Sequence, residues 1–120
     1  MSTKCVLLAD GSQLLREMLH HAIDKADHLR VVQELPDPWE LPVALQRFDP
    51  AWVIVPMAYD DQARLWLDGC MADHPAVRFL FVPPGRHSIK MKWQMSYEED
   101  FEDLTLQEFI EILEKDLQHS

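Results

Sequence analysis

The sequence has little of what metal, redox and phosphate-binding sites require. Its two cysteines, Cys5 and Cys70, have a separation that matches no metal-binding or redox motif, so they are most simply small buried side chains, with a disulfide or a reactive thiol as the alternative. With three glycines, the chain has no glycine-rich phosphate loop. No apolar run approaches the ~18 residues that a membrane-spanning helix needs. We therefore expect no metal, no cofactor and no membrane contact.

Basic residues are also scarce, because 11 lysines and arginines stand against 21 acids, which gives a net charge of −10. Nine of the acids and one lysine lie between residues 98 and 116, so this segment alone carries −8. An acidic surface opposes binding to a phosphate backbone, so we do not expect nucleic acid as a direct partner. A basic stretch, residues 86–92, precedes the acidic segment and is either an exposed polar loop or a docking patch.

Four apolar runs have the length and composition of strands that are buried on both faces. They occupy residues 5–9, 29–33, 51–55 and 77–82. Helical patterns follow the first three runs and return near the C-terminus, and this alternation predicts βαβ units and a parallel sheet. With 120 residues, of which 48% are hydrophobic, the chain is long enough to bury a real core, so we expect one domain over residues 1–120.

The last and the first helices are the best marked. Thr105 and Glu108 form a capping box, and Leu104 with Phe109 can form a hydrophobic staple around it. The predicted buried stripe of this helix is Leu106, Phe109, Ile110, Leu113 and Leu117. Ser12 can cap the first helix. Its predicted apolar stripe is Leu15, Met18, Leu19, Ala22 and Ile23, with His20 and His21 flanking it at the surface.

The two middle helices have less definite beginnings. Asp37 with Glu40 resembles a capping box, but Pro42 would clash inside that helix, so the second helix begins either at Pro38 or only at Pro42, and it ends at Phe48. The third helix follows a cap at residue 60 or 61 and ends near residue 72. Its expected inward-facing residues are Leu67, Cys70 and Met71.

Several local strings occur in the order typical of one known family. They are Leu7-Leu8-Ala9-Asp10, Leu15-Arg16-Glu17, Val31-Val32, residues 49–55 and residues 74–82. Together they resemble the receiver domain of bacterial response regulators, most closely the branch that carries a LuxR-type DNA-binding domain. The resemblance covers residues 4–82 well and 96–117 loosely. It implies an α/β, flavodoxin-like (CheY-like) three-layer sandwich with parallel strand order 2-1-3-4-5.

The positions that would carry the family's phosphorylation chemistry hold other residues here. The resemblance puts the Mg²⁺-binding acidic pair on Asp10 and Gly11, the acceptor aspartate on Pro56, and the Ser/Thr on Pro83. Proline has no nucleophile, and a single carboxylate would hold Mg²⁺ weakly. The family's lysine falls near residues 95–96, where no lysine stands, although Lys92 is close. We therefore predict a degenerate phosphorylation site and no enzyme activity.

Asp60 or Asp61 is the alternative acceptor, although a helix-capping role already explains both residues.

The region after the fourth apolar run departs from the family in length. Residues 85–95 are too few for a helix and a fifth strand, so we expect the fourth helix to be missing or reduced. This changed surface is where we expect a partner to dock, on a face that contains Arg86, Lys90, Lys92 and Trp93 and the acidic segment that follows. Met91, Trp93 and Met95 are either buried in a fifth strand or exposed as interface anchors.

The leading interpretation is a phosphorylation-independent pseudo-receiver of two-component-type signal transduction, which acts through protein–protein interaction. Its partner would be another protein, or a second copy whose acidic last helix pairs with the basic stretch. The chain start has no signal-peptide pattern, so we expect a cytoplasmic protein. The alternative is a small-molecule sensor that uses the crevice at the carboxyl ends of the strands. That crevice would be lined by Pro56, Met57, Tyr59, Pro83 and Pro84.

Overall fold

The computed structural model describes residues 4–9, 13–26, 28–35, 40–55, 61–83, 88–93, 97–103 and 105–114. Within them, strands and helices alternate in the first two thirds of the chain. In order they are β1 (Lys4–Ala9), α1 (Gln13–Asp24), β2 (Leu29–Leu35), α2 (Leu41–Phe48), β3 (Trp52–Val55), α3 (Asp61–Asp73), β4 (Arg78–Phe81), β5 (Ser88–Trp93), β6 (Tyr97–Glu102) and α4 (Leu106–Glu114). The fold is therefore α/β, as the sequence predicts.

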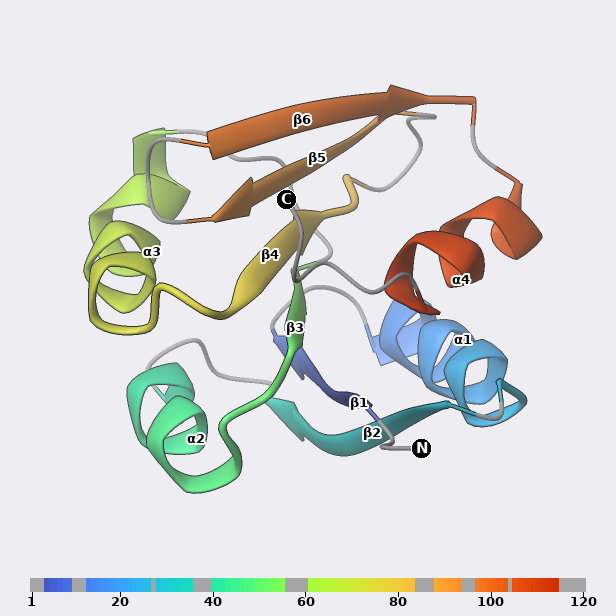
Figure 1. The fold of residues 1–120 in the computed structure, drawn as a ribbon, viewed down its shortest axis with the longest axis horizontal. Coiled ribbons are helices and arrows are strands. Elements are labelled where there is room, and N and C mark those ends of the chain that lie inside the picture. Colours follow the sequence, from blue (N-terminus) through green and yellow to red (C-terminus); the bar gives the residue numbers. More distant parts are fainter. Residues whose placement is uncertain are drawn as a thin grey trace.

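The described strands form one mixed sheet with the order β2-β1-β3-β4-β5-β6. Strands β2, β1, β3 and β4 are parallel, whereas β5 and β6 are antiparallel to their neighbours. Figure 1 shows helices α1 and α4 on one face of the sheet and α2 and α3 on the other. Each face of the central strands is thus covered by helices, which explains why those strands are apolar throughout.

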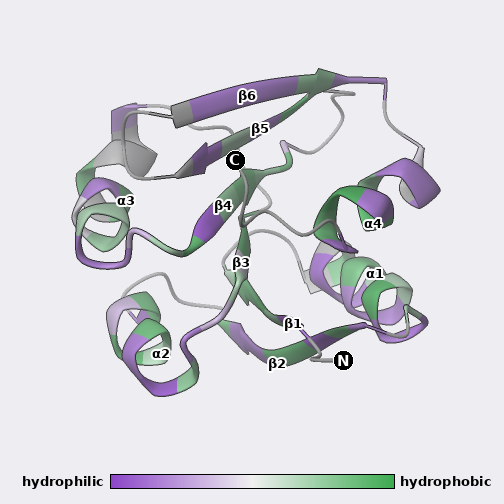
Figure 2. Ribbon diagram, in the orientation of Figure 1, coloured by the Kyte–Doolittle hydropathy of each residue, from purple (hydrophilic) through white to green (hydrophobic). Residues whose placement is uncertain are grey.

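Successive residues of the central strands pack into two separate cores. Leu7 and Ala9 of β1 belong to the core under α2 and α3, whereas Val6 and Leu8 belong to the core under α1 and α4. The same alternation continues along β3 and β4. Figure 2 shows the result, with hydrophobic central strands and a largely hydrophilic β6. The period of two along each strand therefore divides the apolar residues between the two helical layers.

The fifth strand corrects one prediction. The expected parallel pairing is found for β2-β1-β3-β4, but β5 runs antiparallel to β4. Only residues 82–87 separate the two strands, whereas a parallel crossover needs about a dozen residues or more. The chain therefore turns directly back, and the described part of this connection, Val82 and Pro83, is not helical. The connection between β4 and β5 is too short for a helix, as predicted, and its shortness also explains why β5 is antiparallel to β4.

A second strand that the sequence analysis did not predict follows β5. Residues 97–102 (YEEDFE) form β6, which pairs antiparallel with β5 over its whole length. Acidic residues are poor strand formers in general, and they are tolerated here because β6 lies at the sheet edge with one side open to solvent. The acidic run therefore begins as a strand and continues into the last helix.

The last helix agrees closely with the sequence signals. The Glu108 N–H donates to Thr105 Oγ1 at 3.1 Å and the Thr105 N–H donates to Glu108 Oε1 at 3.0 Å, so the capping box is confirmed. The indole Nε1 of Trp52 on β3 donates to the carbonyl of Leu113 at 3.0 Å and ties α4 to the sheet. Buried residues of this helix are Phe109, Ile110, Ile112 and Leu113. The described part does not include the predicted staple residue at position 104, nor the predicted buried side chains at positions 106 and 117.

The other helices agree in part. Leu67, Cys70 and Met71 of α3 are buried as predicted. Helix α2 begins at Leu41 after Glu40, whose side chain makes no capping hydrogen bond, so it starts close to the later of the two predicted positions. The predicted cap Asp37 lies outside the described residues. None of the described helices is long and apolar enough to cross a membrane.

Helix α1 departs from its predicted stripe. Leu19 and Ile23 are buried, but Met18 is 54% exposed, so its predicted burial is wrong. Arg16 occupies the buried face instead, with 9% exposure. The helix thus packs on the sheet along the line of residues 16, 19 and 23, which are three and four positions apart, and it leaves the Met18 side open toward α4.

Candidate functional site

The predicted degenerate phosphorylation site belongs at the carboxyl edge of the parallel strands. Asp10, Gly11 and Pro56 lie outside the described residues, so their arrangement stays a prediction. Pro83 lies two residues after the end of β4 and is half-buried. Asp61, one of the two alternative acceptors, is the exposed first residue of α3, where a carboxylate suits the positive end of a helix dipole.

The predicted interaction face includes Arg86, Lys90, Lys92 and Trp93. Of these, Lys90 and Lys92 are described in full, on β5, and Trp93 ends that strand with a side chain outside the described part. Arg86 lies outside the described residues. Met91, which was expected either buried or exposed, is buried at 3% exposure against the core under α1 and α4. The described part of this face therefore consists of the two lysines and the residues opposite them on β6.

Both lysines are paired with acids of the neighbouring strand. Lys90 Nζ lies 2.9 Å from Glu98 Oε2 and 2.9 Å from Asp100 Oδ1, and Lys92 Nζ lies 3.1 Å from Glu98 Oε1. The register explains this, because Lys90 is directly opposite Asp100 and Lys92 directly opposite Glu98. The two lysines that were predicted to contact a partner are therefore already paired within the hairpin.

The ion pairs also shift proton affinities on the hairpin. The hydrogen bonds that Lys90 donates to Asp100 and then to Glu98 raise the pKa of Lys90. The hydrogen bonds from Lys90 and then Lys92 lower the pKa of Glu98. Glu98 is largely exposed, so solvent screens these interactions and each contributes little to stability. Their main effect is that the charges of the two lysines and the two acids cancel on this face of β5 and β6.

Lys92 does not take the place of the family's lysine. Because β5 runs antiparallel to β4, Lys92 is opposite Phe79, near the beginning of β4 and away from the carboxyl edge of the parallel strands. Its side chain is buried at 7% exposure. The position of Lys92 in the sequence suggested that it lies near the degenerate site. Because β5 is antiparallel to β4, Lys92 lies instead beside the beginning of β4.

The outer strand of the hairpin keeps a surplus of negative charge. Glu99, Glu102 and Asp103 are exposed, and no ion pair joins them to a cation within the described part of the chain. Strand β6 is the last strand of the sheet, so one of its edges has no neighbouring strand among the described residues. The hairpin therefore presents an acidic strand edge, which the β5–β6 pairing holds in an extended conformation.

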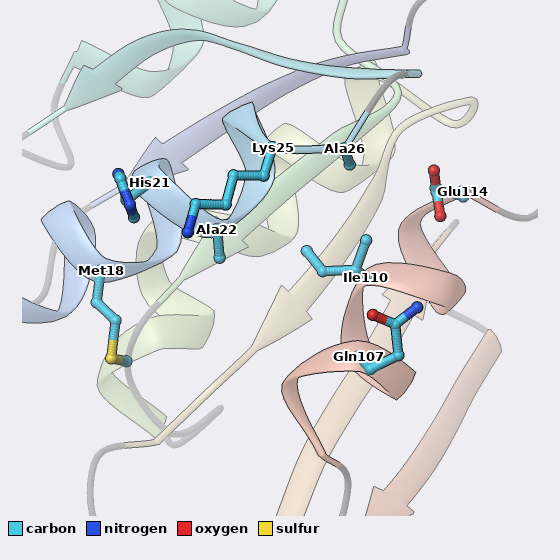
Figure 3. Close-up of a pocket in the computed structure, with 8 residues that line it drawn as sticks. All are labelled: Met18, His21, Ala22, Lys25, Ala26, Gln107, Ile110 and Glu114. Carbon is cyan, nitrogen blue, oxygen red and sulfur yellow. The ribbon is translucent and has the colours of Figure 1, made fainter.

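A groove with a volume of about 480 Å³ lies between α1 and α4. It is lined by Met18, His21, Ala22, Lys25, Ala26, Gln107, Ile110 and Glu114. Figure 3 shows the side chains of the two helices facing each other across it, with Met18 at one end and Lys25 and Glu114 toward the other. The groove has no signal in the sequence, because the pattern of α1 predicts a buried Met18, whereas Met18 is exposed.

The described titratable groups lie in separate places in the fold. Within the described ranges, no three His, Cys, Asp or Glu side chains are arranged to hold a metal ion. His20 lies between two carboxylates, with Nδ1 2.6 Å from Glu34 Oε2 and Nε2 3.1 Å from Asp24 Oδ2, and it joins α1 to β2. Burial, and to a smaller extent Asp73, raises the pKa of the Cys70 thiol, which makes it a poor nucleophile.

Comparison with known proteins identifies no family. No family model matches the sequence, and no curated protein matches it.

Proposed function

We propose that this chain is a phosphorylation-independent signalling module of the pseudo-receiver type, which acts through protein–protein contact made by the β5–β6 hairpin. The parallel β2-β1-β3-β4 arrangement, with helices on both faces, supports a flavodoxin-like framework for the first two thirds of the chain. A proline at position 56, where the resembling family has its acceptor aspartate, supports the loss of phosphorylation. The module would serve two-component-type signalling without accepting a phosphoryl group.

One observation carries the choice of surface, namely that the sheet ends in an open strand edge on an antiparallel hairpin. An open strand edge can accept an extended segment of another protein, because its free N–H and C=O groups pair with those of the incoming strand. Strand β6 has this position in the sheet order. The hairpin also stands where the resembling family has a helix and a parallel strand, so it is the part of the fold most changed in shape.

The charges of the hairpin select the partner. Lys90 and Lys92 already balance Glu98 and Asp100, so the surplus at Glu99, Glu102 and Asp103 favours a basic extended segment. A second copy fits this edge poorly, because pairing β6 with itself would bring acids against acids. We therefore propose a different protein with a basic segment, rather than a homodimer through β6.

The contact is tested by charge reversal on the exposed edge. The double variant Glu99→Lys, Glu102→Lys reverses two of the three unpaired negative charges of this edge, and Glu111→Lys, on the exposed side of α4, is the control for a charge reversal elsewhere on the surface. All three positions are exposed, so each change should alter the free energy of unfolding by no more than about 0.5 kcal/mol. Proteins that are retained from the native cell by the immobilised wild type and the control, but not by the double variant, are the expected result. Identical retained sets for all three proteins would contradict the proposed surface.

Independence from phosphorylation is tested with beryllofluoride and Mg²⁺, which mimic a bound phosphoryl group. Trp52 on β3 reports on the central strand that leads to residue 56, so its fluorescence is a suitable signal. We expect no saturable change up to millimolar concentrations. A saturable, Mg²⁺-dependent change would mean that another carboxylate accepts the group, and the phosphorylation-independent assignment would be wrong.

A further inference from the structure

Arg16 is a buried cation whose side chain has an unused hydrogen-bond donor. It is 9% exposed, and its Nε is shielded from solvent without a hydrogen-bond acceptor. None of the described carboxylates forms an ion pair with its guanidinium. A guanidinium stays charged at any pH that a protein experiences, and burial of an unpaired charge is costly. The Nε donor of Arg16 is therefore shielded from water and has no acceptor from the described part of the chain.

The position of Arg16 makes this burial more unfavourable. It is the fourth residue of α1, and it shares the sheet-facing line of that helix with Leu19 and Ile23, both buried. Side chains on a helix lean toward its N-terminus, which directs a side chain at this position toward the first turn of α1. This end of a helix carries a partial positive charge, which disfavours a cation. No acidic residue lies in the first turn to offset it.

The first turn of α1 supplies further donors at the same place. Helix α1 begins at Gln13, shortly after β1 ends at Ala9, so its N-terminus is at the carboxyl edge of the parallel strands. The first backbone N–H groups of a helix have no acceptor within the helix, and together with the dipole they favour an anion. Open α/β sheets bind ligands at this edge, where the strand order reverses on either side of β1 and β3.

We propose that Arg16 and the N-terminal turn of α1 form a binding site for a phosphate-type oxyanion. The guanidinium presents a planar fork of donors that matches the oxygens of a phosphate group, and the helix N-terminus adds backbone donors and a favourable dipole. Binding is noncovalent and needs neither an acceptor aspartate nor Mg²⁺. The site is independent of the proposed hairpin contact, and it would give the module a small anionic ligand as an input.

The first test is thermal unfolding in inorganic phosphate against sodium chloride at equal ionic strength. The wild type should show a higher Tm in phosphate, because a ligand that binds only the folded state stabilises it. Arg16→Met should lose this increase, and its Tm in chloride should be equal to or above that of the wild type, since the variant removes an unpaired buried charge. Arg30→Met, at an exposed position on β2, is the matched control and should keep the phosphate response. Equal increases in phosphate and chloride, or an unchanged response in Arg16→Met, would overturn the proposal.

A second measurement needs no variant. In nitrogen-15 spectra of the wild-type protein, the Nε–H signal of Arg16 and the amide signals of Gln13 and Leu14 should shift saturably as inorganic phosphate is added. Glycerol 3-phosphate in a parallel titration separates the two sources of the group, because tighter binding than inorganic phosphate indicates a phosphorylated metabolite and weaker binding indicates free phosphate. If Arg16→Met folds, its phosphate affinity should be lower by roughly tenfold or more, as expected for the loss of a charge-assisted hydrogen bond. Signals that do not move in either titration would overturn the proposal.

Discussion

Replacement of Trp52 by Phe tests how the last helix is held on the sheet. Trp52 lies on β3, is 1% exposed, and packs in the core shared with α1 and α4. Its indole Nε1 donates to the carbonyl of Leu113, 3.0 Å away, near the end of α4. Phe places its six-membered ring where the five-membered ring of the indole stood, and it carries no N–H group. The variant therefore removes one inter-element hydrogen bond and leaves a gap of about three ring atoms.

The two losses can be estimated separately. About 0.8 kcal/mol per buried CH₂-sized group gives roughly 2 kcal/mol for the missing atoms. The lost hydrogen bond contributes about 1 kcal/mol more, because the Leu113 carbonyl then has no indole donor. The free energy of unfolding should thus fall by about 3 kcal/mol, within the usual range for aromatic core truncations. A domain with a typical stability of roughly 5–15 kcal/mol should remain folded.

Urea unfolding followed by far-ultraviolet circular dichroism measures this change without relying on tryptophan fluorescence. With an m value of roughly 1–3 kcal/mol/M, the midpoint should fall by about 1–3 M at unchanged m. Leu65→Ala is the control, because Leu65 is 86% exposed on α3 and its truncation should cost no more than about 0.5 kcal/mol. A loss below about 1 kcal/mol for Trp52→Phe would refute the packing and the hydrogen bond described here.

Two further predictions concern the capping box and the buried thiol. Thr105→Ala should destabilise the protein by about 1 kcal/mol at neutral pH, measured by urea unfolding. The backbone N–H of Thr105, and then its hydroxyl, lower the pKa of Glu108, so the stabilisation is present above the ordinary glutamate pKa and is lost as pH falls through the lowered one. Glu108→Gln should make the acid limb shallower than in the wild type, where Glu98 also contributes through its lowered pKa, and an equally steep limb in Glu108→Gln would contradict this origin. Because burial raises the pKa of Cys70, its thiol should react with a disulfide reagent far more slowly in the native protein than in urea. Any fast reaction of the native protein with this reagent should therefore keep the same rate in Cys70→Ala.

Local patterns in the sequence were sufficient where short-range physics decides the structure. The capping box at Thr105 and Glu108 could be predicted because both hydrogen bonds join residues three apart. The apolar runs became β1, β3 and β4 because residues that are apolar on both sides can only be buried between two layers. The inward-facing positions of α3 followed from helical periodicity alone.

Local patterns failed where two segments distant in sequence compete or combine. The acidic run from residue 97 predicts no strand, and it forms β6 because β5 offers a partner edge with Lys90 and Lys92 in register. Met18 and Arg16 are both on α1, and the rotation of that helix on the sheet decided which was buried. Neither outcome has a signal within a window of one helix or strand.

The sequence by itself determined the α/β class, the order of the elements as far as β4, the apolar strands and the cap of the last helix, because each depends on neighbours within a few residues. It also determined that position 56 holds no acceptor, since this is a matter of residue identity. Only the tertiary structure decided the direction of β5, the pairing of the two lysines within the hairpin, the open edge of β6 and the burial of Arg16. These features depend on which surfaces meet after the chain has turned, and that is settled by packing and charge between segments far apart in the sequence.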